Sequence, residues 1–399
     1  MPDPFSVTRA RRAALAAVGS ALLLGACVRG GGGGGFPAPT RVPRPAPAEV
    51  EHTLFLIGDA GAPHDPTEPV LEALKRQLRV VKTPTTVVFL GDNIYPRGLP
   101  DTNAIVVPTR EETERRLLAQ IDVAVSTRTP TYFIPGNHDW AYMTEDGWDA
   151  IRRQETFIRE HGAPYAQLQP TGGCPGPVYV DLGRRLRLLM IDTQWWLHDY
   201  DRPRHPESKC PTDSPAEVVN AMNRAMLRVS RGRHVVVVGH HPLASGGLHG
   251  GHLGLREHLF PLRSISRWLY VPLPVVGSYY ALNRQQGASN QDLAGPKNQR
   301  MRRALEVVFS RRHPLVYAAG HDHDLQVMEG RTARYILVSG AGVYNHVTDT
   351  HYRANTIYAA ARSGFMRLDF LRDGRVRLGV ELVDGESAVT ESHSMYLKH

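Results

Sequence analysis

The strongest constraint on the fold of this chain is one arrangement that recurs five times along it. Each time, an apolar run of strand length is followed by a glycine and then by a side chain that can bind a metal ion. The runs and the pairs that follow them are His52 to Ile57 with Gly58-Asp59, Thr86 to Leu90 with Gly91-Asp92, Thr131 to Pro135 with Gly136-Asn137, His234 to Val238 with Gly239-His240, and Pro314 to Ala319 with Gly320-His321. Glycine lets the backbone turn sharply where a buried strand ends. A single such turn would be weak evidence, because aspartate is common there, but five in series indicate a shared site.

Helical patterns lie between several of these runs, as expected of an α/β protein. The expected helices span Glu68 to Arg79, Glu111 to Ser126, Gly147 to Glu160, Pro215 to Arg231, and Asn298 to Arg311. If the strands share one sheet or two packed sheets, the polar side chains converge at the carboxyl ends of the strands, where α/β proteins place their sites. Three more strands are expected at Arg334 to Ser339, Gly364 to Leu371 and Arg375 to Leu382, the last two joined by a hairpin at Asp373-Gly374.

The motifs resemble the five blocks of the calcineurin-like metallophosphoesterases, and more narrowly those of the purple acid phosphatase branch. The matching segments are Gly58-Asp59-Ala60-Gly61, Gly91-Asp92-Asn93-Ile94-Tyr95, Gly136-Asn137-His138-Asp139, Val238-Gly239-His240 and Gly320-His321-Asp322-His323. Most of the superfamily has a histidine two residues after the first aspartate, where this chain has Gly61. A tyrosine three residues after the second aspartate replaces it in that branch, and Tyr95 is in place. The resemblance covers residues 51 to about 343 and implies a four-layer α-β-β-α sandwich with a binuclear metal site at the carboxyl ends of the strands.

The resemblance also assigns metal ligands. It gives Fe(III) the side chains Asp59, Tyr95 and His323, gives a second, divalent ion (Fe, Zn or Mn) the side chains Asn137, His240 and His321, and makes Asp92 the bridge. A phenolate is a hard anionic donor, so Tyr95 favours a trivalent ion. Such an ion can hold the phenol deprotonated despite its free pKa of about 10.

The activity implied is that of an acid phosphatase-like phosphoric monoester hydrolase, in which metal-bound hydroxide attacks phosphorus. The departing alkoxide needs a proton. His138 follows the ligand Asn137 and has the carboxylate of Asp139 beside it in sequence, so Asp139 is expected to be catalytic together with His138. The resemblance therefore implies that His138 binds substrate or acts as the general acid.

Three further histidines, His241, His249 and His252, closely follow the ligand His240. His249 is nine residues beyond it, an offset that matches a second substrate-facing histidine in the smaller purple acid phosphatases, although His252 in the same loop is a rival. His241 directly follows the ligand and is expected to hydrogen-bond around the site rather than to bind metal.

The same chemistry admits other activities. A phosphodiesterase or nucleotidase would use the same ligands and differ in pocket shape. A lipoprotein that retains metal but has lost turnover is a third reading, which the intact ligand set and His138 disfavour.

The N-terminus reads as an export signal. Arg9, Arg11 and Arg12 precede an apolar run from Ala13 to Leu24, which is too short to span a bilayer as a mature helix. The sequence Leu24-Gly25-Ala26-Cys27 resembles a lipobox, so residues 1–26 are expected to be a lipoprotein signal peptide and Cys27 to carry lipid. An ordinary cleaved signal with a coincidental cysteine is the alternative.

Residues 27–50, rich in Gly and Pro, would then tether the exported protein to a membrane, either in the periplasm or at the outer membrane or cell surface. The catalytic domain would span 51–399. Its insertion, at about 253–297, contains the apolar run from Leu259 to Leu282 with Trp268, which suits either a flap over the site or a contact with the membrane interface.

Two cysteines remain besides Cys27. In an exported protein the even pair Cys174 and Cys210 favours a disulfide over two free thiols. The formal net charge is +8, but the arginines are dispersed without lysine blocks or interleaved aromatic residues. No nucleic-acid site is therefore evident, and a mild attraction for phosphate-bearing anions is the inference that the charge supports.

Overall fold

The computed structural model describes residues 40–252, 259–260 and 270–398. The expected signal peptide, Cys27 and Trp268 lie outside these residues. Within the described part of the chain, no helix is both long enough and apolar enough to cross a bilayer.

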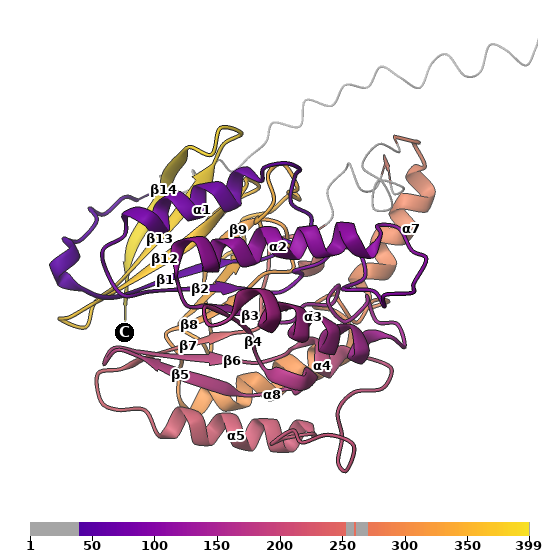
Figure 1. The fold of residues 1–399 in the computed structure, drawn as a ribbon, viewed down its shortest axis with the longest axis horizontal. Coiled ribbons are helices and arrows are strands. Elements are labelled where there is room, and N and C mark those ends of the chain that lie inside the picture. The colour runs from indigo at the N-terminus through magenta and orange to yellow at the C-terminus, as the bar shows by residue number, and fades with distance from the viewer. Residues whose placement is uncertain (1–39, 253–258, 261–269, 399) are drawn as a thin grey trace, which may run out of the picture. The chain divides into compact units, whose positions relative to one another are not determined.

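Two mixed seven-stranded sheets face each other (Figure 1). The first consists of β1 (Val50–Ile57), β2 (Thr85–Phe89), β3 (Thr131–Phe133), β4 (Ala166–Leu168), β12 (Gly364–Leu371), β13 (Val376–Val383) and β14 (Val389–Leu397), in the order β14-β13-β12-β1-β2-β3-β4. The second consists of β5 (Val178–Leu182), β6 (Leu186–Met190), β7 (His234–Val238), β8 (Val316–Ala319), β9 (Leu325–Glu329), β10 (Tyr335–Ser339) and β11 (Thr356–Ala360), in the order β11-β9-β10-β8-β7-β6-β5.

Helices cover the outer faces of both sheets. The first sheet packs against α1 (Pro69–Val80), α2 (Arg110–Thr127) and α3 (Gly147–Gly162), and the second against α5 (Pro215–Leu227) and α8 (Pro296–Arg311) (Figure 1). Among the described residues, the remaining helices are α4 (Gln194–Leu197), α7 (Pro274–Gln285) and the 3-10 turns η1 (Pro47–Glu49), η2 (Thr171–Gly173) and η3 (Leu248–Gly250). The four-layer α-β-β-α sandwich expected from the sequence is confirmed.

The second half of strand β1 is apolar throughout. Leu54 and Leu56 face the core between the two sheets, whereas Phe55 and Ile57 face the helices, and all four side chains are fully buried. A strand buried on both faces needs a continuous apolar run rather than an alternating one. Each such side chain contributes roughly 1.5–3 kcal/mol to folding.

Parallel register brings the predicted ligands to one edge. Ile57 of β1 pairs with Phe89 of β2, which pairs with Phe133 of β3, so Asp59, Asp92 and Asn137 follow strands that end side by side. In the second sheet β7 and β8 are also parallel, with Val238 opposite Ala318. His240 and His321 therefore leave that sheet at the same end.

The structured part of the chain starts earlier than the expected boundary at residue 51. Val42 accepts hydrogen bonds from Arg377, and Arg44 forms an ion pair of 2.6 Å with Glu381. Residues 40–44 thus contact β13 and β14 and are packed on the first sheet, ahead of the expected start of the domain.

Cys174 and Cys210 are joined in a disulfide, with their Cα atoms 5.5 Å apart. This bears out the pairing favoured from the even cysteine count. The bridge fastens the loop before β5 to the segment before α5, and closing a loop of this size contributes about 3 to 4 kcal/mol in the chain-entropy model.

Candidate metal centre

The three side chains predicted to bind iron lie together in the structure. The hydroxyl of Tyr95 is 3.0 Å from Oδ1 of Asp59 and 3.0 Å from Nε2 of His323. Oδ2 of Asp92 is 3.2 Å from the same hydroxyl. Burial, and then the carboxylates of Asp59 and Asp92, raise the pKa of Tyr95 well above its ordinary value.

The three side chains predicted to bind the second ion form an adjoining group. Nε2 of His240 lies 3.0 Å from Oδ1 of Asn137 and 3.1 Å from Nδ1 of His321. Oδ2 of Asp92 is 3.4 Å from the same Nε2. One carboxylate oxygen of Asp92 therefore lies between the two groups, as a bridging ligand must.

The hydrogen bonds of the two histidines leave room for a cation between them. Nδ1 of His240 donates to the carbonyl of Leu90 at 2.9 Å, so in the neutral ring its Nε2 presents a lone pair. Nε2 of His321 donates to the carbonyl of Gln291 at 2.9 Å, so its Nδ1 also presents a lone pair. Two lone pairs that face each other at 3.1 Å repel unless a positive charge lies near them.

The electrostatics of His240 agree with this reading. Burial opposes a positive charge on its ring, but the carboxylate of Asp92 outweighs burial and raises the pKa of His240 to about 9. A bound metal would take the place of that proton. Two overlapping groups of donor atoms, one with Asp59, Asp92 and His240 and one with His240, His241 and His321, are compact enough to hold an ion.

The strained backbone of the strand-end turns lies at the ligands, whereas among the glycines before them only Gly91 has a positive φ. Asp59, Asp92 and His321 have φ values of 57°, 53° and 73°, which residues other than glycine rarely adopt. Such strain persists where the surrounding structure holds it, and it clusters at functional sites.

The glycines before the ligands are needed mainly for close approach. A Cβ on Gly136 would lie 2.2 Å from Oδ1 of Asp92, and one on Gly320 would lie 2.4 Å from Oδ2 of Asp59. Any larger residue would push the carboxylates out of the site.

Gly61 has its own steric reason. A Cβ there would lie 2.5 Å from the backbone of residues 92–94, so no side chain fits at the position where most of the superfamily has histidine. Tyr95 reaches the site from the neighbouring loop, and its amide donates to the carbonyl of Gly61 at 3.1 Å. The exchange of histidine for tyrosine is thus built into the packing of these two loops.

His138 lies at the edge of the site with its ring fixed. Its Nδ1 donates to the carbonyl of Pro96 at 2.6 Å, and its Nε2 is 3.8 Å from Oδ2 of Asp92. The ring is flanked by Tyr95 and Tyr142, with ring centroids at 4.4 and 4.7 Å. Nε2 is therefore the atom that can meet a substrate.

Asp139 is placed differently from the expectation. Its carboxylate is fully buried and accepts hydrogen bonds from the backbone amides of Asn93, Ile94 and Gly136 at 2.8 to 3.2 Å. The partner of the His138 ring is the Pro96 carbonyl. Asp139 thus braces two ligand loops and is not directed at the ring beside it in sequence, because successive residues of this turn point in different directions.

His249 lies at the site, as expected from its offset, and His252 does not compete with it. The ring of His249 is 3.8 Å from the ring of His321, and its Nδ1 is 2.8 Å from Oδ1 of Asp292. His252 instead contacts the guanidinium of Arg353 at 3.0 Å. Burial would raise the pKa of Asp292, but Arg284 and His249 lower it, so Asp292 is a carboxylate that orients His249.

His241 has partners for both of its ring nitrogens. Nδ1 is 2.8 Å from the Thr193 hydroxyl and Nε2 is 2.7 Å from Oε1 of Gln291. These bonds place it around the ligands as expected, although its donor atoms are close enough to be grouped with those of His240 and His321.

Three residues near the site have no signal in the sequence. Gln291 and Asp292 come from the insertion, where they hold His321 and His249. His346 is exposed, and its ring centroid lies 4.5 Å from that of His323 and 5.8 Å from that of Tyr95. None of the three stands in a motif, so only the fold brings them to the metal centre.

Known proteins are similar to this chain in sequence. A model of the calcineurin-like phosphoesterase family matches residues 52–271. Purple acid phosphatase 17 of Arabidopsis thaliana is 26% identical over 181 residues, which are 44% of this chain and 47% of that protein. The match thus spans about half the length of that relative.

Solved structures share the fold. Purple acid phosphatase PPD1 from yellow lupin (Lupinus luteus) seeds superposes with a TM-score of 0.51 and 12% identity, covering 88% of this chain and 55% of that one. A structure of PhoD gives 0.52 and 12%, covering 90% of this chain and 71% of that one. The family model covers more than half of the chain and includes the loops of Asp59, Asp92, Asn137 and His240. The chain belongs to the calcineurin-like phosphoesterase family and is similar to its purple acid phosphatase branch.

Proposed function

We propose that this chain is a binuclear metal-dependent phosphoric monoester hydrolase of the acid phosphatase type. The observation that carries the proposal is the position of Asp92, whose Oδ2 is 3.2 Å from the Tyr95 hydroxyl and 3.4 Å from Nε2 of His240. One carboxylate placed between a phenol-containing and an imidazole-containing group is a donor set for two unlike ions.

The residues divide between the ions by donor chemistry. Asp59, Tyr95 and His323 would hold Fe(III), Asn137, His240 and His321 would hold a divalent Fe, Zn or Mn, and Asp92 would bridge them. When bound, such a pair supplies a nucleophilic water at mildly acidic pH and neutralises charge on the phosphoryl oxygens.

Two histidines are available for substrate. With Nδ1 of His138 committed to the Pro96 carbonyl, Nε2 faces the site and would give a proton to the leaving oxygen. His249, oriented by Asp292 and lying against the ring of His321, would bind the phosphoryl group.

The proposal is tested by metal analysis of the purified protein together with a panel of phosphate monoesters and diesters. We expect two metal ions per chain and a higher kcat/KM for monoesters. Preference for diesters would replace the proposed activity with that of a phosphodiesterase of the same chemistry. Absence of turnover on every ester, with both metals bound, would favour a binding protein.

We also propose that the protein is a lipoprotein tethered through Cys27, on the evidence of the Leu24 to Cys27 lipobox and the Gly/Pro-rich segment after it. Cys27→Ser should prevent lipid attachment and either block signal processing or release soluble protein, measured by fractionation and by the mass of the mature N-terminus. Unchanged membrane association with an unmodified N-terminus would overturn the tether.

A further inference from the structure

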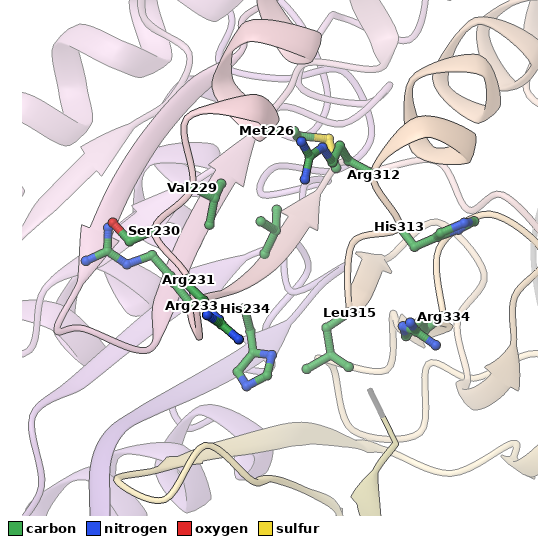
Figure 2. Close-up of a pocket in the computed structure, with 11 residues that line it drawn as sticks. Met226, Val229, Ser230, Arg231, Arg233, His234, Arg312, His313, Leu315 and Arg334 are labelled. Carbon is green, nitrogen blue, oxygen red and sulfur yellow. The ribbon is translucent and has the colours of Figure 1, made fainter.

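A concave site lies away from the metal centre, at the edge of the second sheet where β7, β8 and β10 begin. It is a cavity of about 320 Å³ built from the loop after α5, the turn after α8 and the turn before β10 (Figure 2). The metal ligands follow the carboxyl ends of β7 and β8, so the sheet separates the two sites. His234 lines the cavity and His240 faces the metals, roughly 20 Å apart at the rise of a strand.

The cavity is lined by cationic side chains and by no acidic one. Its charged residues are Arg231, Arg233, Arg312 and Arg334, with His234 and His313 beside them (Figure 2). Among the residues that the structure describes, no side-chain hydrogen bond or ion pair is found for Arg231, Arg312 or Arg334. Three guanidinium groups are thus left to a ligand or to solvent.

The other basic side chains of the cavity already have hydrogen-bond partners in the protein. Arg233 is 2.6 Å from Oδ2 of Asp181 and also donates to the carbonyls of Gly183 and Arg184. Nε2 of His234 is 2.7 Å from the carbonyl of Gly374, and Nδ1 of His313 donates to the carbonyl of Thr332 at 2.7 Å. These contacts give the cavity a shape that does not depend on a ligand.

We propose that this cavity binds an organic phosphate dianion. Guanidinium groups match the several acceptor oxygens of a phosphate, and three of them without acidic partners supply the opposite charge. Met226, Val229 and Leu315 give the same cavity an apolar wall, which suits the organic part of the ligand. The cavity's size fits a small group better than a nucleic-acid backbone. The group is either a soluble phosphate compound or the headgroup of an anionic lipid.

The arginines have a simpler explanation, stabilisation of helix ends, which the experiment must distinguish from ligand binding. Helices α5 and α8 end at Leu227 and Arg311, next to Arg231 and Arg312. Cations near a helix C-terminus stabilise it without any ligand. On that explanation, neutralising the arginines would lower the melting temperature and leave anion binding unchanged.

The test uses the metal-loaded full chain and n-butylphosphonate, a dianion with an apolar chain that the enzyme cannot hydrolyse. Hydrogen exchange is followed at saturating phosphonate in the wild type, in R231Q/R312Q/R334Q, and in the control R79Q/R159Q/R300Q. The control removes the same charge from three exposed arginines outside the cavity. The amides of residues 228–235 and 311–315 report on the cavity, and those of the metal loops report on the active site.

We expect both regions to be protected in the wild type and the control, and only the metal loops in the cavity variant. Its affinity at the cavity should fall roughly tenfold for each arginine removed. Its kcat on a phosphate ester should equal that of the control. Equal protection of residues 228–235 in all three proteins would overturn the proposal.

A second arm identifies the source of the phosphate. The same proteins are sedimented with vesicles of phosphatidic acid in phosphatidylcholine and with phosphatidylcholine alone. If the cavity variant alone loses binding to the acidic vesicles, the ligand is a lipid headgroup, whereas cavity protection by phosphonate without a vesicle difference indicates a soluble compound. If neither the phosphonate nor the acidic vesicles distinguish the cavity variant, the proposal is overturned. The same holds if the variant differs only by a lower melting temperature, because the arginines then only stabilise the helix ends.

Discussion

Tyr95→Phe should remove the visible absorption of the oxidised enzyme while the fold remains intact. The hydroxyl of Tyr95 lies 3.0 to 3.2 Å from the predicted metal-binding atoms of Asp59, Asp92 and His323. If it binds Fe(III) as a phenolate, the native protein is coloured by a charge-transfer band that phenylalanine cannot supply. The measurement is the visible spectrum per mole of iron, with circular dichroism as the check on folding.

Tyr142→Phe is the matched control for this change. Its ring stacks on His138, but the side chain is about half exposed, at 52%, and lies beside the site rather than among the ligands. This variant should keep the colour and the iron. A native enzyme that is colourless and fully active with only zinc or manganese would contradict the iron assignment.

The strands that the sequence predicts are those buried on both faces. β1, β2, β7 and β8 end in continuous apolar runs, and they form the centres of the two sheets. Edge strands gave little signal. β5 and β14 lie at the edges and carry polar side chains at exposed or partly exposed positions, and β4 has three residues. Because such strands gain stability from pairing rather than from burial, their own residues identify them poorly.

The seven predicted ligands were readable because each stands in one of the motif segments that follow strand ends. The residues that hydrogen-bond to the histidines of the site could not be predicted from the sequence. Gln291 reaches His321 through a backbone carbonyl, which any residue type provides, and its place depends on how the insertion packs. Asp292 meets His249 across 43 residues of sequence. Such contacts come from tertiary packing, so no local sequence pattern predicts them.

His138→Ala should lower kcat far more on an alkyl phosphate than on a nitrophenyl phosphate. A basic alkoxide needs a proton as it leaves, and help from a general acid is worth about 10² to 10⁴-fold, whereas a nitrophenolate leaves largely unaided. His138 is placed for this role because its Nδ1 is held by Pro96 and its Nε2 faces the metal centre. The measurement compares kcat for both esters, with metal content determined in each protein.

His252→Ala serves as the control, since that histidine contacts Arg353 and is not among the residues that meet the ligands. It should leave both rates near the wild-type values. If His138→Ala lowers both rates equally with both metals bound, His138 positions the phosphoryl group and does not donate the proton. The same comparison with His249→Ala then decides whether the acid is His249, whose ring lies 3.8 Å from that of His321 and is oriented by Asp292.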